Sequence, residues 1–183
     1  MIEPAETAVD LHRFFERALR ATFRDLAVHD DLAAAYLADL LTRFARTDDL
    51  YPKGAVLPRL ETVVDMILEI GAAWQVASPH FAPEREVTVR RHLGDYTLFM
   101  TGIFRERVEH VASTGYYIAQ GKRAYHFVSE HDRASVRPTS MGGGPLYRRL
   151  AERFEAYAGA LDYARKVYFP EHPARPFLQL GLS

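Results

Sequence analysis

The sequence contains no cysteine and carries almost no net charge. Without cysteine, the chain can form no disulfide and can hold no thiolate zinc site, cysteine nucleophile or iron–sulfur cluster on cysteine ligands. Its 23 basic and 24 acidic side chains leave a formal net charge of −1. No overall electric field therefore attracts nucleic acid or an anionic membrane surface. We expect no nucleic-acid partner and no membrane partner.

Long apolar runs are missing as well. In the central part of the chain the longest stretch without a charge covers residues 96–104, far short of the ~20 residues that a membrane-spanning helix needs. Residues 1–7 are acidic and polar, so they do not resemble a secretory signal, which has a basic region and then an apolar run. We expect a cytoplasmic protein, and a length of 183 residues suits one domain.

Apolar residues recur at three- and four-residue spacing along most of the chain, which is typical of amphipathic helices. No alternating pattern of useful length indicates a strand. We therefore predict an all-α, single-domain helical bundle over residues 1–183, with five to six helices and an extended C-terminal tail at 170–183. The expected helices cover residues 6–29, 32–46, 58–76, 83–110, 115–131 and 146–169.

Local signals mark several helix boundaries. Asp30 or Asp31 is expected to cap the helix at 32–46. Ser113 or Thr114 is expected to cap the helix at 115–131. Turn residues at 47–58 and glycines within 133–144 separate neighbouring helices. The apolar side chains expected to face inward from the helix at 58–76 are Leu60, Val63, Val64, Ile67, Leu68 and Ile70.

Residues 93–104 form the least polar long segment, and Asp95 is its one charged residue. A helix here is expected to be surrounded by other helices, because apolar residues fall on nearly every side. Gly94 and Gly102 lie inside it, where each glycine costs ~1 kcal/mol relative to alanine, so we expect close backbone contact. Burying an unpaired carboxylate is costly. Asp95 must therefore reach an edge or be held by partners.

The segment that follows is rich in tyrosine, with small residues at Gly121 and Ala124. A buried tyrosine hydroxyl needs a partner, and the nearest candidates are Asp95 and His92. Two alternatives stay open: a packed helix pair whose buried polar atoms satisfy one another, or a polar pocket with Arg105 as an anion contact. The candidate ligand-binding residues are His92, Asp95, Arg105, Tyr116, Tyr117 and Tyr125.

Sequence motifs of known catalytic and cofactor sites are absent. There is no Glu-x-x-His pair of di-iron bundles and no His-Glu-x-x-His. Glu106 with His110 and His126 with Glu130 are weak metal-ligand candidates, since the same four-residue spacing is typical of surface pairs. The glycines at 142–144 lack the Gly-Lys-Ser/Thr ending of a phosphate-binding loop, so they form a connector or a lid. We assign no cofactor, no metal site and no catalytic residue.

Three motifs together resemble those of a known group of proteins. They are LGDxxLFxxGxF from Leu93, YYxxxGxxAY from Tyr116 and LAERF from Leu150. Over residues 39–167 the chain is similar to a group of uncharacterised bacterial all-helical proteins of about 200 residues. The resemblance implies a cytoplasmic helical domain and transfers no activity.

The leading hypothesis is a non-enzymatic bundle that binds a partner protein or a small ligand. One alternative is an enzyme or ligand sensor whose polar pocket lies between the helices at 83–110 and 115–131. In that case Asp95 and His92 would be acid–base groups. A third hypothesis is metal or haem binding through His92, His110 or His126. A homodimer formed through the tail or an aromatic helix face is a further open alternative.

Overall fold

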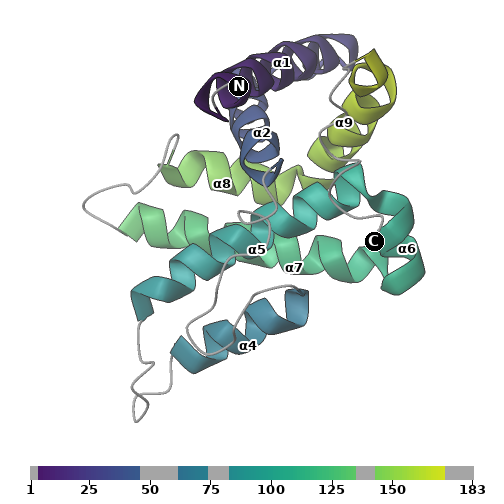
Figure 1. The fold of residues 1–183 in the computed structure, drawn as a ribbon. Helices are drawn as coiled ribbons and strands as arrows, with labels where there is room; N and C mark the ends of the chain where they lie inside the picture. Colours follow the sequence, from purple (N-terminus) through teal and green to yellow (C-terminus); the bar gives the residue numbers. More distant parts are fainter. Residues whose placement is uncertain (1–3, 46–61, 74–82, 135–142, 172–183) are drawn as a thin grey trace.

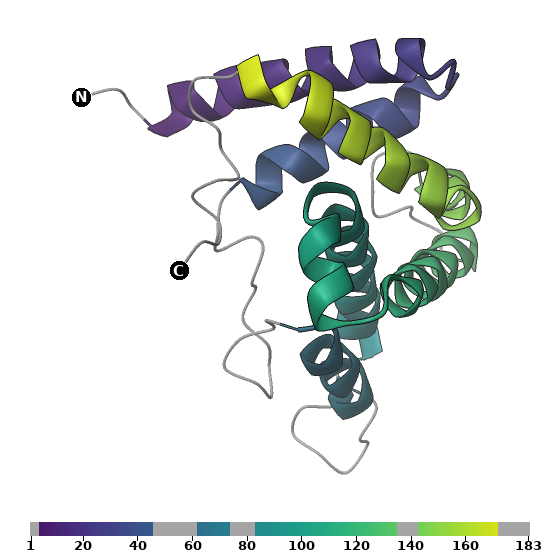
Figure 2. The same cartoon turned by 90° about the vertical axis from the view of Figure 1, so that its right-hand side faces the viewer.

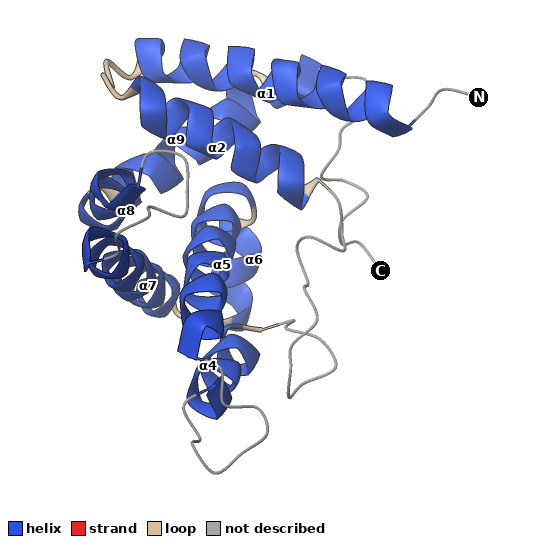
Figure 3. Cartoon of the chain, turned by 90° about the vertical axis from the view of Figure 1, so that its left-hand side faces the viewer, coloured by secondary structure: helices blue, strands red, loops and turns tan. Residues whose placement is uncertain are grey.

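The computed structural model describes residues 4–45, 62–73, 83–134 and 143–171 (Figure 1). Within these residues the chain is helical and has no strand, which confirms the all-α prediction (Figure 3). The helices are α1 (Pro4–Asp25), α2 (Asp31–Phe44), α4 (Val63–Ala73), α5 (Pro83–Ile103), α6 (Arg105–Val111), α7 (Thr114–Ala134), α8 (Gly143–Glu152), α9 (Phe154–Val167) and the 3₁₀ turn η1 (Phe169–Glu171).

These residues contain eight α-helices where we expected five to six. The expected helix at 83–110 is interrupted at Phe104, which has φ −117° and ψ 36°. The expected helix at 146–169 is interrupted at Arg153, which has φ −111° and ψ 25°. Buried apolar residues continue on both sides of each break, for example at Val108 and Phe154. Hydrophobic spacing alone therefore does not reveal the change in backbone direction.

Two helix starts are set by side chains that accept backbone hydrogen bonds. Asp30 caps α2 by accepting from the Ala33 amide at 3.0 Å, which confirms the expected cap. Before α4, the Thr62 amide donates to Asp65 at 3.0 Å and the Asp65 amide donates to the Thr62 hydroxyl at 3.1 Å. This reciprocal pair satisfies two amides that a helix start leaves free.

Some expected features lie outside the described residues. These are the whole of the turn at 47–58, most of the glycine-rich segment at 133–144, and the tail from residue 172 onward. Glycines 143 and 144 belong to α8, so the described part of that segment begins a helix. Pro170 lies in η1, so the first residues of the expected extended tail form a 3₁₀ turn instead.

The helices form successive layers around α5. From top to bottom in Figure 1 they run from α1 through α2 to α5 with α7, and then to α4. The quarter-turn view keeps the same order, with α9 beside α1 (Figure 2). Every residue from 93 to 103 is buried. The expectation that this segment is surrounded by other helices is therefore confirmed.

Glycine allows α5 to approach its neighbours closely. A Cβ added at Gly94 would lie 2.7 Å from ring carbons of Tyr125 on α7. A Cβ added at Gly102 would lie 2.6 Å from Cβ of Leu161 on α9. Both distances are well inside van der Waals contact. The expected close backbone contact at these two glycines is confirmed.

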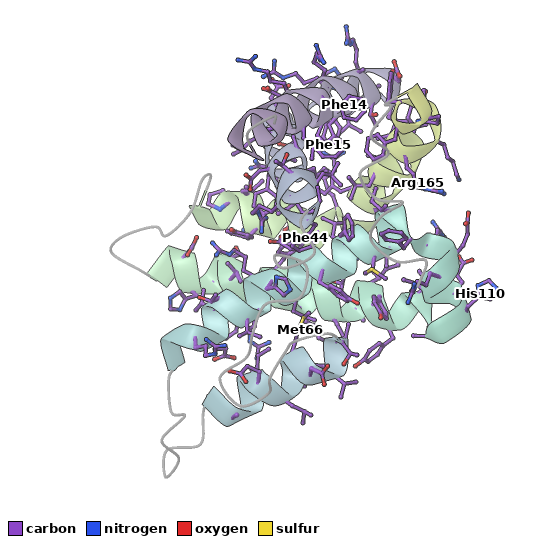
Figure 4. The ribbon with its side chains drawn as sticks, in the orientation of Figure 1. Phe14, Phe15, Phe44, Met66, His110 and Arg165 are labelled. Atoms are coloured by element: carbon purple, nitrogen blue, oxygen red, sulfur yellow. The ribbon has the colours of Figure 1, made fainter. Side chains whose placement is uncertain are left out.

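The helix at 58–76 differs from expectation in the direction of its apolar residues. In α4 the buried apolar side chains are Val63, Met66, Ile70 and Ala72, and Met66 points from α4 toward α5 (Figure 4). Val64, Ile67 and Leu68, which we expected to face inward, are instead 56%, 38% and 57% exposed. The helix is apolar on more than one side, so its sequence does not distinguish the packed side from the exposed one.

Gly102→Ala should lower the free energy of unfolding by about 1–3 kcal/mol, because the new methyl group overpacks against Leu161. Gly159→Ala on α9 is the matched control, since a Cβ there meets nothing within 4 Å. The control should be neutral or stabilising by up to about 1 kcal/mol, because alanine is the better helix former. Urea unfolding of both variants measures the difference, and equal stabilities would contradict the close approach.

Candidate functional site

Asp95 is a fully buried carboxylate that accepts hydrogen bonds from two other helices. The hydroxyl of Tyr36 on α2 donates to Oδ1 at 2.6 Å, and the hydroxyl of Tyr125 on α7 donates to the same oxygen at 2.7 Å. Nη2 of Arg43 on α2 donates to Oδ2 at 3.0 Å. Such charge-assisted bonds are stronger than neutral ones. Through this one side chain α5 is bonded to α2 and α7.

Helix geometry places these donors. Tyr36 and Arg43 are seven residues apart, about two helical turns, so they lie on the same face of α2. Asp39, between them, accepts from Nε of Arg43 at 2.9 Å and orients the guanidinium group. On α5, the absence of a side chain at Gly94 leaves room for the Tyr125 ring against the backbone. The neighbouring Asp95 therefore comes within reach of the Tyr125 hydroxyl.

The electrostatics of the Asp95 cluster keep its donors protonated. Burial, reinforced by the charge of Asp95, raises the pKa of Tyr36 and of Tyr125 well above the usual 10.0. Burial acts to lower the pKa of Arg43, but the nearby Asp95 outweighs it and the net shift is upward. Both carboxylate oxygens thus accept from donors that remain protonated at neutral pH. This geometry favours the alternative in which buried polar atoms satisfy one another.

A second carboxylate, Asp30, repeats the combination at the start of α2. Oδ2 accepts from Nε of Arg149 on α8 at 2.8 Å and from the hydroxyl of Tyr157 on α9 at 2.8 Å, while Oδ1 caps α2. Burial would raise the pKa of Asp30, but hydrogen bonds from Ala33, Tyr157 and Arg149 outweigh it and lower the pKa. Burial and Asp30 raise the pKa of Tyr157 to about 12. Two carboxylate clusters therefore connect α2 to the rest of the fold.

Of the six candidate ligand-binding residues, Asp95 and Tyr125 are joined by a hydrogen bond. His92, Tyr117 and Tyr116 belong to a row of aromatic rings instead. The ring centroids of His92 and Tyr96 lie 6.4 Å apart, those of Tyr96 and Tyr117 6.5 Å, and those of Tyr117 and Tyr116 6.4 Å. The row ends at Tyr116, which is 39% exposed.

Arg105 and the first of the two weak metal pairs lie on α6. Arg105 is exposed and pairs with Glu109 at 3.2 Å. Nδ1 of His110 lies 2.6 Å from the backbone carbonyl oxygen of Glu106, and Figure 4 places His110 at the margin of the molecule. The Glu106 carboxylate is 3.5 Å from Arg165. Among the described residues no group of three His, Cys, Asp or Glu side chains could hold a metal ion.

The second weak pair, His126 with Glu130, lines an open groove of about 490 Å³ beside α7 and α8. Two of the groove's cations have partners: Lys122 pairs with Glu155 at 2.9 Å, and Arg148 pairs with Glu152 at 2.8 Å. Arg123 and His126 form no hydrogen bond or ion pair with a described residue. The complete lining is Lys122, Arg123, His126, Glu130, Arg148, Ala151 and Glu152.

Two members of the Asp95 cluster, Tyr36 and Arg43, were not among the sequence candidates. Tyr36 fits the apolar face of its helix, so the hydrophobic spacing does not indicate that its hydroxyl donates a hydrogen bond. The available signal was a hydroxyl and a guanidinium two turns apart on that face, since both need partners when buried. Nothing in one sequence shows which residue of another helix they meet.

No family model, curated protein or solved structure matches the chain. None of the helices in the described residues is both long and apolar enough to cross a membrane. The functional proposal therefore rests on the residues and contacts of this chain.

Asp95→Asn should lower the free energy of unfolding by about 3 kcal/mol, since it removes the charge from a buried group that accepts hydrogen bonds from Tyr36, Tyr125 and Arg43. Tyr36→Phe and Tyr125→Phe should each cost about 1.5–3 kcal/mol. The double tyrosine variant should cost more than the sum, because each hydroxyl alone still satisfies Oδ1. Urea unfolding measures these costs, with Tyr116→Phe as the control within about 0.5 kcal/mol of the parent. Additive or negligible losses would contradict the shared cluster.

Asp30→Asn tests the second cluster, and asparagine retains the helix cap. The folded state lowers the pKa of Asp30 below 3.8, so its stabilisation is complete above that value and is lost as pH falls through the folded-state pKa. The stability difference between parent and variant should stay constant from about pH 7 to pH 5 and shrink below about pH 4. Urea unfolding at each pH measures it. A difference that does not shrink in acid would contradict this assignment.

Proposed function

We propose that this chain is a non-enzymatic helical domain that acts by binding a protein partner through one face of α4. The observation that carries the proposal is a stripe of large apolar side chains on the surface. Val64, Ile67 and Leu68 are 56%, 38% and 57% exposed. Their three- and four-residue spacing puts them on one side of the helix. We call Val64, Ile67, Leu68 and the exposed Gly71 the α4 stripe.

The α4 stripe belongs to a firmly packed helix. Its opposite side is buried, and the carboxylate of Glu69, which is 1% exposed, pairs with Arg85 of α5 at 2.5 Å. The reciprocal hydrogen bonds of Thr62 and Asp65 hold the helix start. The stripe is therefore exposed on a helix that is attached to the rest of the fold. Its side chains have defined positions on the surface.

The composition of this surface favours a protein partner over a charged ligand. Every exposed residue between Thr62 and Ala72 is uncharged. The other large exposed apolar side chains in the described residues are scattered over separate helices or loops: Leu26, Leu32, Tyr116 and Val167. Single exposed apolar residues are common on soluble proteins, whereas clusters mark interaction sites.

Two other observations bear on the choice of function. Asp95, the candidate acid–base group of the enzyme hypothesis, has 0% exposure and both oxygens bonded, which supports a non-enzymatic role.

The groove beside α7 and α8 is a second candidate site, for a small anion, because Arg123 and His126 line it without partners among the described residues. It is the weaker candidate, since Glu130 and Glu152 also line it and would repel an anion.

The proposal is tested by placing a photo-crosslinking amino acid at Leu68 in the full chain, expressed in its native cells. We expect a covalent adduct with a protein, identified by mass spectrometry, because this position lies within the partner's footprint. The adduct should disappear when Ile67→Glu is added, since a buried unpaired charge opposes docking. The matched control is the same label at Val167, which is 43% exposed on α9. No adduct at Leu68, or an equal adduct at Val167, would contradict the proposal.

A further inference from the structure

We propose that the partner of the α4 stripe is a second copy of this chain, which pairs α4 against α4 in antiparallel fashion about a two-fold axis. This inference rests on the proposed function of the same surface. It identifies the occupant from the chemistry and shape of the stripe itself. In a two-fold dimer the same patch is used on both subunits and must be complementary to itself.

The α4 stripe has this self-complementary spacing. When the two-fold axis passes between Ile67 and Leu68, each Ile67 faces Leu68 of the second copy. Each Val64 then faces Gly71 of the second copy. A Cβ added at Gly71 meets no atom within 4 Å, so the surface there is open. A large side chain opposite a glycine, beside two apolar side chains of similar size, is the alternation that lets facing helices interdigitate.

The absence of charged residues from the α4 stripe also favours a second copy of the chain as its partner. A partner that placed a charged residue on the α4 stripe would bury it without a counter-charge, because the exposed residues here are uncharged. The partner surface must therefore be apolar and uncharged where it contacts the stripe. A second α4 meets this requirement in full, and antiparallel pairing also sets the two helix dipoles in opposite directions.

One helix seam is smaller than the roughly 800 Å² per subunit of a stable interface. We therefore expect a dimer that dissociates at micromolar concentration. Sedimentation velocity of the full chain over a hundredfold range of concentration should show a monomer–dimer equilibrium. Ile67→Glu and Leu68→Lys should each weaken the dimer at least tenfold, whereas the control Val167→Lys should leave it unchanged.

Mixing the two charged variants gives the sharpest test. In the mixed dimer the new carboxylate at position 67 faces the new ammonium at position 68 of the other copy. The symmetry-related contact is unchanged, because it joins Leu68 of the Ile67→Glu copy to Ile67 of the Leu68→Lys copy. An equimolar mixture of Ile67→Glu and Leu68→Lys should therefore recover most of the association that each variant loses alone. Circular dichroism of each variant confirms that it is folded.

An uncharged pair of variants tests the other predicted contact. Gly71→Val has room in the monomer but places valine against Val64 of the second copy, so it should weaken the dimer about tenfold. Adding Val64→Ala restores the space and should recover the association. A dimer that neither pair of variants weakens and restores would overturn the antiparallel arrangement.

The outcomes separate this inference from the proposed function. A monomer at all concentrations, with a Leu68 adduct to a different protein, would overturn the second copy as occupant and leave partner binding in place. A monomer with no adduct would overturn both. An adduct joining two copies of this chain, together with recovery in the mixture, would support both.

Discussion

The fold depends on the hydrogen bonds that satisfy one buried carboxylate at the centre of the molecule. Asp95 lies in the most enclosed helix, and a buried charge without partners would cost several kcal/mol. Its donors come from α2 and α7, so these helices must keep a fixed register against α5. Apolar packing tolerates small shifts, whereas a hydrogen bond fails beyond a few tenths of an ångström. The cluster therefore specifies the arrangement that the hydrophobic core stabilises.

The two clusters hold α2 at two different points. Asp30 bonds its start to Arg149 and Tyr157, on α8 and α9, and Asp95 bonds Tyr36 and Arg43 to α5. Both use a carboxylate, an arginine and tyrosine hydroxyls, a set in which each donor stays protonated at neutral pH. The hydrogen bonds at these two points oppose sliding and rotation of α2 against α5, α8 and α9. These connections between helices favour a structural role for these charged side chains.

The sequence was sufficient for features that depend on a single helix or on the cost of burial. It predicted the all-α class, a cap at Asp30 or Asp31, the close contacts at Gly94 and Gly102, and Asp95 or His92 as the partner of a buried tyrosine. It did not predict features that depend on the packing of separate helices. The breaks at Phe104 and Arg153 lie within continuous apolar patterns. The contribution of Arg43 requires the register of α2 on α5, which local spacing does not contain.

The most informative disagreement concerns α4. We expected Val64, Ile67 and Leu68 to face inward because apolar residues of this size are usually buried. In the structure Val63, Met66 and Ile70 already occupy the buried side, which leaves a second apolar face. A helix that is apolar on both sides is normally enclosed on both sides. This second apolar face, exposed in the described part of the chain, is the physical basis for the proposal that a partner covers α4.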